Sequence, residues 1–170
     1  SAVIGGDGAE EVHGIAVDGA GSSYVTGTTT STNFPVVNAA QGSNAGGRDG
    51  FLLKLSPNGG TLLYSTYVGG QEIDEANGVA VDAAGNAYVV GTTFSSNFPV
   101  ASSRQSALGG GTDAFLTKFA PAGGFVFSTY HGGSRSDEGR GVIVDGSSSA
   151  IVVGTTLSTD FPTASPTQAT

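Results

Sequence analysis

A segment of 23 residues recurs three times along this chain of 170 residues, and this repeat constrains the fold more than any other feature. The copies read HGIAVDGAGSSYVTGTTTSTNFP, NGVAVDAAGNAYVVGTTFSSNFP and RGVIVDGSSSAIVVGTTLSTDFP, and they span His13–Pro35, Asn77–Pro99 and Arg140–Pro162. Successive copies begin 64 and then 63 residues apart. A repeat at a nearly fixed spacing indicates a protein built from similar units, each packed on its neighbours.

A second block recurs between these copies. DGFLLKLSP at Asp49–Pro57 matches DAFLTKFAP at Asp113–Pro121, and YSTYVGG at Tyr64–Gly70 matches FSTYHGG at Phe127–Gly133. The opening SAVIGG has the pattern of the end of an earlier copy. We therefore expect a single repeat domain over 1–170, divided into a partial repeat 1–6, full repeats 7–70 and 71–133, and a partial repeat 134–170.

Each full repeat contains four segments with the alternating, β-branched pattern of strands. In the second repeat they cover 78–82, 87–93, 114–119 and 125–130, and tight Gly, Asn and Pro turns join them in pairs. Four antiparallel strands per repeat make up the blade of a β-propeller. The sequence predicts an all-β chain with eleven strands, forming about two and a half to three four-stranded antiparallel blades. The predicted core contains Val17, Val25, Phe51, Leu53, Val81, Val89, Phe115, Val144 and Val152.

The connection between the second and third strands of each repeat is long, covering 31–48 and 95–112. Unstructured loops of this length are uncommon in compact domains unless they have a function. The connection repeats a Phe-Pro pair at Phe34, Phe98 and Phe161. Because phenylalanine prefers burial, we expect it to anchor the loop on the blade while proline stiffens it. An aromatic contact surface for a partner is the alternative.

The combined pattern GVAVDAAGNAYVVGTT…NFPV…DAFLTKFAPAGG…FSTYHGG resembles the bacterial β-propeller repeats known as SBBP repeats, and it is similar to the wider NHL-type blade family. The resemblance covers nearly the whole chain. It implies a propeller fold, usually within large secreted or surface-anchored bacterial proteins, and no particular chemistry. Members of such families bind, scaffold or lie beside other domains.

Acidic residues form the one polar pattern that recurs in every copy. An acidic pair precedes the first strand of each repeat and a single aspartate ends it: Glu10, Glu11 and Asp18; Asp74, Glu75 and Asp82; Asp137, Glu138 and Asp145. Ca²⁺ takes such oxygen ligands, so these nine residues are candidate calcium ligands. The alternative, which we favour, is that the aspartates accept backbone hydrogen bonds in turns, because calcium loops concentrate several oxygen ligands within about a dozen residues.

Composition and motifs favour a protein that is not an enzyme. Carboxylate pairs can hydrolyse glycosidic bonds, but these pairs recur in every copy whereas an active site is usually singular. His13 and His131 are not repeated, and no nucleophile elbow, phosphate-binding loop or zinc-protease motif occurs. With a net charge of −8 and only six dispersed basic residues, the chain offers no basic face for a nucleic acid. No apolar run is long enough to span a membrane.

The absence of cysteine, the few lysines and the abundant Gly, Ser and Thr suggest an extracellular or bacterial cell-surface protein. The lack of any methionine suggests a processed or excised chain.

Fewer than three complete blades cannot close a propeller ring, and unpaired strand edges recruit other chains. Three arrangements are open: an excised part of a longer propeller, a ring of copies, or head-to-tail addition of copies. We predict a structural or interaction module that self-assembles into a ring or filament through its open blade edges. The alternative is a propeller that binds carbohydrate or protein through its long loops, and a hydrolase with its active site elsewhere is a third interpretation.

Overall fold

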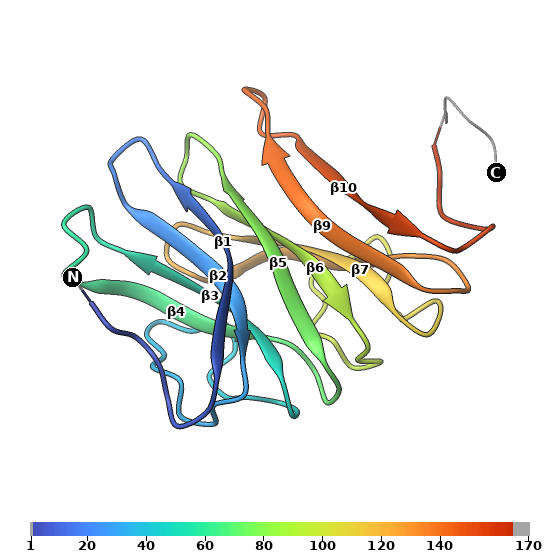
Figure 1. The fold of residues 1–170 in the computed structure, drawn as a ribbon. Helices are drawn as coiled ribbons and strands as arrows, with labels where there is room; N and C mark the ends of the chain where they lie inside the picture. Colours follow the sequence, from blue (N-terminus) through green and yellow to red (C-terminus); the bar gives the residue numbers. More distant parts are fainter. Residues whose placement is uncertain (1, 165–170) are drawn as a thin grey trace.

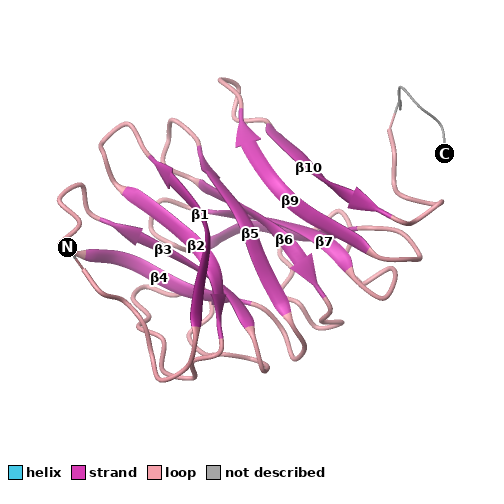
Figure 2. Ribbon diagram, in the orientation of Figure 1, coloured by secondary structure: helices cyan, strands magenta, loops and turns pink. Residues whose placement is uncertain are grey.

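The computed structural model describes residues 2–164, which form ten β-strands in three antiparallel sheets (Figures 1 and 2). Blade 1 contains β1 (Glu10–Val17), β2 (Ser23–Thr29), β3 (Asp49–Leu55) and β4 (Leu62–Val68). Blade 2 contains β5 (Asp74–Val81), β6 (Ala87–Thr93), β7 (Asp113–Phe119) and β8 (Phe125–His131). The half-blade contains β9 (Asp137–Val144) and β10 (Ala150–Thr156). Within residues 2–164 no helix is long and apolar enough to cross a membrane.

Strands pair in chain order within each sheet, which confirms the predicted all-β fold of four-stranded antiparallel blades. The first strand of each blade begins earlier than the pattern predicted. In blade 2, for example, β5 starts at Asp74 rather than at Gly78, so the strand includes the acidic pair. The predicted opening strand is wrong for residues 2–6, which pair with no other strand in the described structure. The described residues thus hold ten strands rather than eleven. Ser1 and residues 165–170 of the predicted partial repeats lie outside the described range.

A β-bulge interrupts the first strand of every blade at the same position. The register skips one residue at His13, Asn77 and Arg140, so each of these is left without a partner across the ladder. A glycine lies opposite each bulge, and a Cβ on Gly91 would lie only 1.8 Å from the Glu75 carbonyl oxygen. Glycine suits these positions because the backbone of the bulged strand approaches them closely.

The long connections run back along the outer edge of each blade. Val37 exchanges two backbone hydrogen bonds with Ser65 of β4, with N···O distances of 3.2 and 2.8 Å, and Ala101 does the same with Ser128 of β8. Phe34 and Phe98 are each 3% exposed and pack against aromatic rings inside the blades. The prediction that the phenylalanine anchors the loop is confirmed for these two copies, while Phe161 is half-buried against His131.

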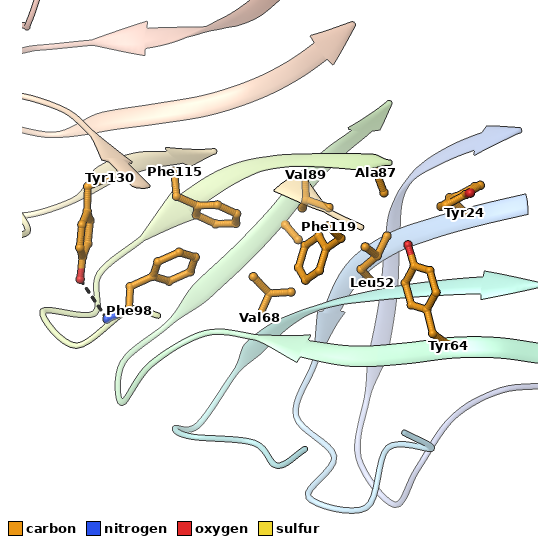
Figure 3. Packing of buried hydrophobic residues seen from close by; sticks show 11 residues of the cluster. Tyr24, Leu52, Tyr64, Val68, Ala87, Val89, Phe98, Phe115, Phe119 and Tyr130 are labelled. Carbon is orange, nitrogen blue, oxygen red and sulfur yellow. Dashed lines mark hydrogen bonds between the residues drawn. The ribbon is translucent and has the colours of Figure 1, made fainter. Parts of the chain in front are cut away.

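The main core fills the junction between blade 1 and blade 2 (Figure 3). Tyr24, Leu52 and Tyr64 of blade 1 meet Ala87, Val89 and Phe119 of blade 2 there. The predicted core residues Phe51, Leu53, Val89 and Phe115 are buried, and Val25, Val81 and Val144 are half-buried.

For two residues, the prediction that they lie in the core is wrong. Val17 is 59% exposed because it lies on the outer face of blade 1, and Val152 is 37% exposed because the half-blade has no third strand beside β10.

We predict that Gly91→Ala destabilises the protein by roughly 1–3 kcal/mol or more, because the added methyl group would collide with the Glu75 backbone and the Phe115 ring. Chemical denaturation of the variant measures this loss. Gly111→Ala is the matched control, since a Cβ there would meet no atom within 4 Å. Equal unfolding free energies for the two variants would contradict this account of the bulge.

Candidate functional site

The blades stack so that the back face of one packs on the front face of the next, and β1, β5 and β9 follow one another across the molecule (Figure 1). Side chains alternate between the two faces of a strand, and the bulge shifts that alternation by one residue. The front faces contain Val12, Ile15 and Val17 in blade 1, Ala76, Val79 and Val81 in blade 2, and Gly139, Val142 and Val144 in the half-blade. The back faces contain Gly14, Ala16 and Tyr24, then Gly78, Ala80 and Tyr88, then Gly141, Ile143, Ile151 and Val153.

Glycines on the back faces let the first strands of neighbouring blades approach closely. A Cβ on Gly14 would lie 3.3 Å from the Val79 nitrogen, and one on Gly78 would lie 3.4 Å from the Gly141 Cα. The junctions are therefore closest at the bulges.

The bulge residue of one blade reaches the backbone of the next. His13 Nδ1 lies 3.2 Å from the Ala76 carbonyl oxygen, and Asn77 Nδ2 donates to the Gly139 carbonyl oxygen at 2.9 Å. Arg140 occupies the same position in the half-blade, where its guanidinium pairs with Glu138 of its own strand. His13 was not among the predicted site residues, although polar residues occupy the same position in the other two copies.

A tyrosine makes the second link across each junction. The Tyr24 hydroxyl lies 3.1 Å from the Gly85 carbonyl oxygen in the next blade. In the same way, the Tyr88 hydroxyl lies 3.1 Å from the backbone carbonyl oxygen of Ser148. Inside its own blade each hydroxyl also approaches an aspartate, Asp18 or Asp82.

A lysine on the third strand completes this group in both blades. Lys54 Nζ lies 3.4 Å from Asp18 and 4.7 Å from the centre of the Tyr24 ring, and Lys118 takes the same position beside Asp82 and Tyr88. These lysines and tyrosines were not among the predicted site residues, although both recur in the two full repeats.

The single aspartates Asp18, Asp82 and Asp145 are turn residues. In each turn the Oδ1 atom accepts backbone hydrogen bonds from the residues two and four positions later, at 2.8–3.0 Å. Burial acts to raise the pKa of Asp18 and Asp82, but the amide, hydroxyl and lysine neighbours outweigh it and hold both pKa values below the ordinary range. This is the turn chemistry that the sequence analysis favoured.

The two members of each acidic pair have different surroundings. Asp74 and Asp137 are fully buried, and their Oδ2 atoms accept hydrogen bonds from the Gly70 and Gly133 amides at 2.6 and 2.7 Å. Glu10 holds the equivalent place in blade 1, where it accepts from Thr29, Ser31 and the Gly6 amide.

The second members lie on the surface. Arg48 lies between Glu11, at 2.7 Å, and Glu75, at 3.7 Å, and Glu138 pairs with Arg140. Within residues 2–164 no three His, Asp or Glu side chains converge as a metal ion would require. Calcium binding by the nine acidic candidates therefore stays a prediction.

A family model described as the SBBP beta-propeller repeat matches residues 4–35 and 63–99. The chain carries SBBP beta-propeller repeats. No curated protein sequence matches the chain. Each matched segment contains the first two strands of a blade together with the Phe-Pro pair that anchors its loop.

The two outermost SBBP blade faces are apolar and uncovered. On the front of blade 1, Val12, Ile15 and Val17 are 59–67% exposed, and on the back of the half-blade, Ile143, Ile151 and Val153 are 50–62% exposed. These are the same two kinds of face that pack together at both internal junctions. Contiguous exposed apolar patches of this kind are typical of interaction surfaces.

We predict that Tyr88→Phe destabilises this SBBP chain by about 1–2 kcal/mol, because it leaves the Ser148 carbonyl and Asp82 without their hydroxyl partner. Denaturant unfolding measures the change. Tyr64→Phe is the control, since the Tyr64 hydroxyl is buried without a hydrogen-bond partner and its removal should be neutral or slightly stabilising. If both variants lost the same stability, the tyrosine link across the junction would be refuted.

Proposed function

We propose that this chain is a non-enzymatic extracellular or cell-surface structural module that assembles with copies of itself. The propeller-blade fold supports a propeller-type interaction module. In the proposed assembly, the back face of the half-blade of one copy packs on the front face of blade 1 of the next copy. Such a head-to-tail contact is heterologous, so repeated addition forms a ring or an open filament.

One observation carries this proposal: both open faces are versions of faces that already pack together within the chain. The back faces of blades 1 and 2 rest on the front faces that follow them, and the open faces expose aliphatic side chains at the same positions. Burying each of these side chains contributes roughly 1.5–3 kcal/mol.

The back face of the half-blade has different side chains from the other two back faces, but these side chains are also apolar and fill the same positions. Ala16 and Tyr24 in blade 1, like Ala80 and Tyr88 in blade 2, combine one small and one large side chain. In the half-blade Ile143 and Ile151 stand in their places. The proposed contact between copies is therefore more aliphatic than the internal junctions, and it lacks the tyrosine link.

Arg140 supplies the polar part of the proposed contact. His13 and Asn77 reach the backbone carbonyl of the next blade at the position equivalent to Val12. In the assembly, Arg140 would reach the Val12 carbonyl of the next copy, beside Glu11, whose charge is opposite.

The free edge of β10 adds to the tendency to associate. Its backbone groups on the side away from β9 have no ladder partner in the described structure, and such edges recruit further strands. The competing function, ligand binding through aromatic loops, has less support because Phe34 and Phe98 are buried inside their blades.

A mixing experiment with two single variants tests the assembly. Ile15→Lys blocks the front face and Ile151→Lys blocks the back face, so we expect either variant alone to associate at least about tenfold more weakly than the wild type. Mixed together, they should form a one-to-one dimer, because each retains the face that the other lacks. Light scattering and negative-stain electron microscopy measure mass and shape.

Val3→Lys is the control, because Val3 is fully exposed and lies on neither face. Rings or filaments of the wild type and of this control, together with dimers only in the mixture, are the expected results. A wild-type chain that stays monomeric at all concentrations would contradict the proposal, and so would a mixture that forms no dimer.

A further inference from the structure

Two buried aspartates face each other at each junction between blades. Asp49 begins β3 and Asp74 begins β5 of the next blade, while Asp113 and Asp137 repeat this arrangement between blade 2 and the half-blade. All four are 0% exposed. The backbone brings each pair together, since the Asp74 amide donates to the Arg48 carbonyl and the Asp137 amide to that of Thr112, both at 2.9 Å.

The carboxylates of each pair converge on a glycine. A Cβ on Gly69 would lie 2.9 Å from both Asp49 Oδ1 and Asp74 Oδ2, and one on Gly132 would lie 2.6 Å from Asp113 Oδ1 and 2.8 Å from Asp137 Oδ2. One oxygen from each aspartate of a pair therefore approaches the same glycine, and the Oδ2 atoms of Asp74 and Asp137 also accept hydrogen bonds from the Ser95 and Ser158 hydroxyls.

The hydrogen bonds leave two buried carboxylate oxygens without a partner at the first junction and one at the second. Asp49 Oδ2 accepts from Gln41 Nε2 and the Ala45 amide, both at 3.0 Å, and Asp74 Oδ2 accepts from the Gly70 amide at 2.6 Å and the Ser95 hydroxyl at 2.8 Å. Asp49 Oδ1 and Asp74 Oδ1 have no hydrogen-bond partner. At the second junction the atom without a partner is Asp137 Oδ1. A buried carboxylate oxygen without a donor is costly, so a donor at this position would stabilise the fold.

No basic side chain neutralises these pairs. The ion pairs in the described structure engage Glu11, Glu75, Asp18, Asp82 and Glu138, and none of the four junction aspartates. Two buried like charges that lie close together cannot both stay ionised without a large penalty. A proton, or another cation, must therefore compensate one of the two charges.

We propose that the two aspartates at each junction bind one shared proton, so that contact between blades is tighter in mild acid than at neutral pH. The proton comes from solvent and protonates one of the two carboxyl groups, so that the pair carries a single negative charge. A metal ion fits less well, because Ca²⁺ takes six to eight oxygen ligands and the junction offers few that are free.

The electrostatic surroundings agree with this assignment. Burial, together with the charge of Asp74, raises the pKa of Asp49 to about 6, although the Ala45 amide and Gln41 lower it. Burial also raises the pKa of Asp74 and of Asp113, and Asp137 adds to the effect on Asp113. A carboxyl group whose pKa is higher in the folded protein contributes stability below that pKa, and this contribution is lost as the pH rises through it.

Other titratable groups face the pairs. Glu72 and the Tyr130 hydroxyl lie near Asp74, Tyr67 lies near Asp49, and His131 and Arg104 lie near the second junction. The first junction is the cleaner one to test, because Val68 stands where the second has His131.

The test compares the thermal unfolding midpoint of the wild type and Asp49→Asn at about pH 8 and about pH 5. Asparagine keeps the accepting oxygen and places an amide donor where the proton would lie. We expect D49N to raise the midpoint by a few degrees at the higher pH, and this advantage should shrink at the lower pH. The turn aspartates lose stability in acid in both proteins, so the difference between the two reports on the pair. Glu72→Gln, which removes a neighbouring charge outside the pair, is the control and should change little.

Carbon-13 NMR titration of the carboxyl groups provides a second, direct measurement. A wild-type Asp49 carboxyl that titrates near pH 6 would support the proposal, whereas one that titrates below about pH 4 would overturn it. A lower midpoint of D49N at both pH values would also overturn it. Finally, if Ca²⁺ added after chelation raised the wild-type midpoint at about pH 8 but not that of D49N, the pair would be a metal site rather than a proton site.

Discussion

Each blade is a thin sheet with two largely apolar faces, and neither face can leave water without another blade beside it. This constraint explains why the largest core lies between blade 1 and blade 2 rather than inside either sheet. It also explains the small residues on the back faces, since Gly14 and Gly78 let neighbouring strands come close enough to exclude water. The polar links follow from the same geometry, because the bulge aims one side chain out of its own ladder at the next blade. The stability of any one repeat therefore depends on its neighbours.

The sequence was sufficient to predict the features that depend on neighbouring residues or that recur in every repeat. Alternating residues predicted the strands, and the tight turns of Gly, Asn and Pro predicted how they are joined in pairs. Residues 2–6 failed because a strand exists only through its partner, and their apolar pattern could not show that none is present in the described structure.

Contacts between blades could not be predicted from the sequence for a different reason. Asp49 and Asp74 belong to different strands of different blades, and nothing in their spacing indicates that both carboxylates approach the same glycine. Within blade 1, Lys54 reaches Asp18 because the third strand lies beside the second, and the distance between the two residues in the sequence does not indicate this. Exposure was also misjudged at Val17, because a front-face position is buried only when another blade covers it.

The long loops restrict the direction in which further blades can be added to such a protein. By pairing Val37 with Ser65 and Ala101 with Ser128, they occupy the outer edges of β4 and β8 that would otherwise offer hydrogen bonds to foreign strands. Blade 1 and blade 2, whose outer edges are covered in this way, cannot widen, so a further blade can be added to them only along the stacking axis. Gene duplication could then change the number of blades while leaving the rim unaltered. The rim would keep its protection against amyloid-like pairing whatever that number became.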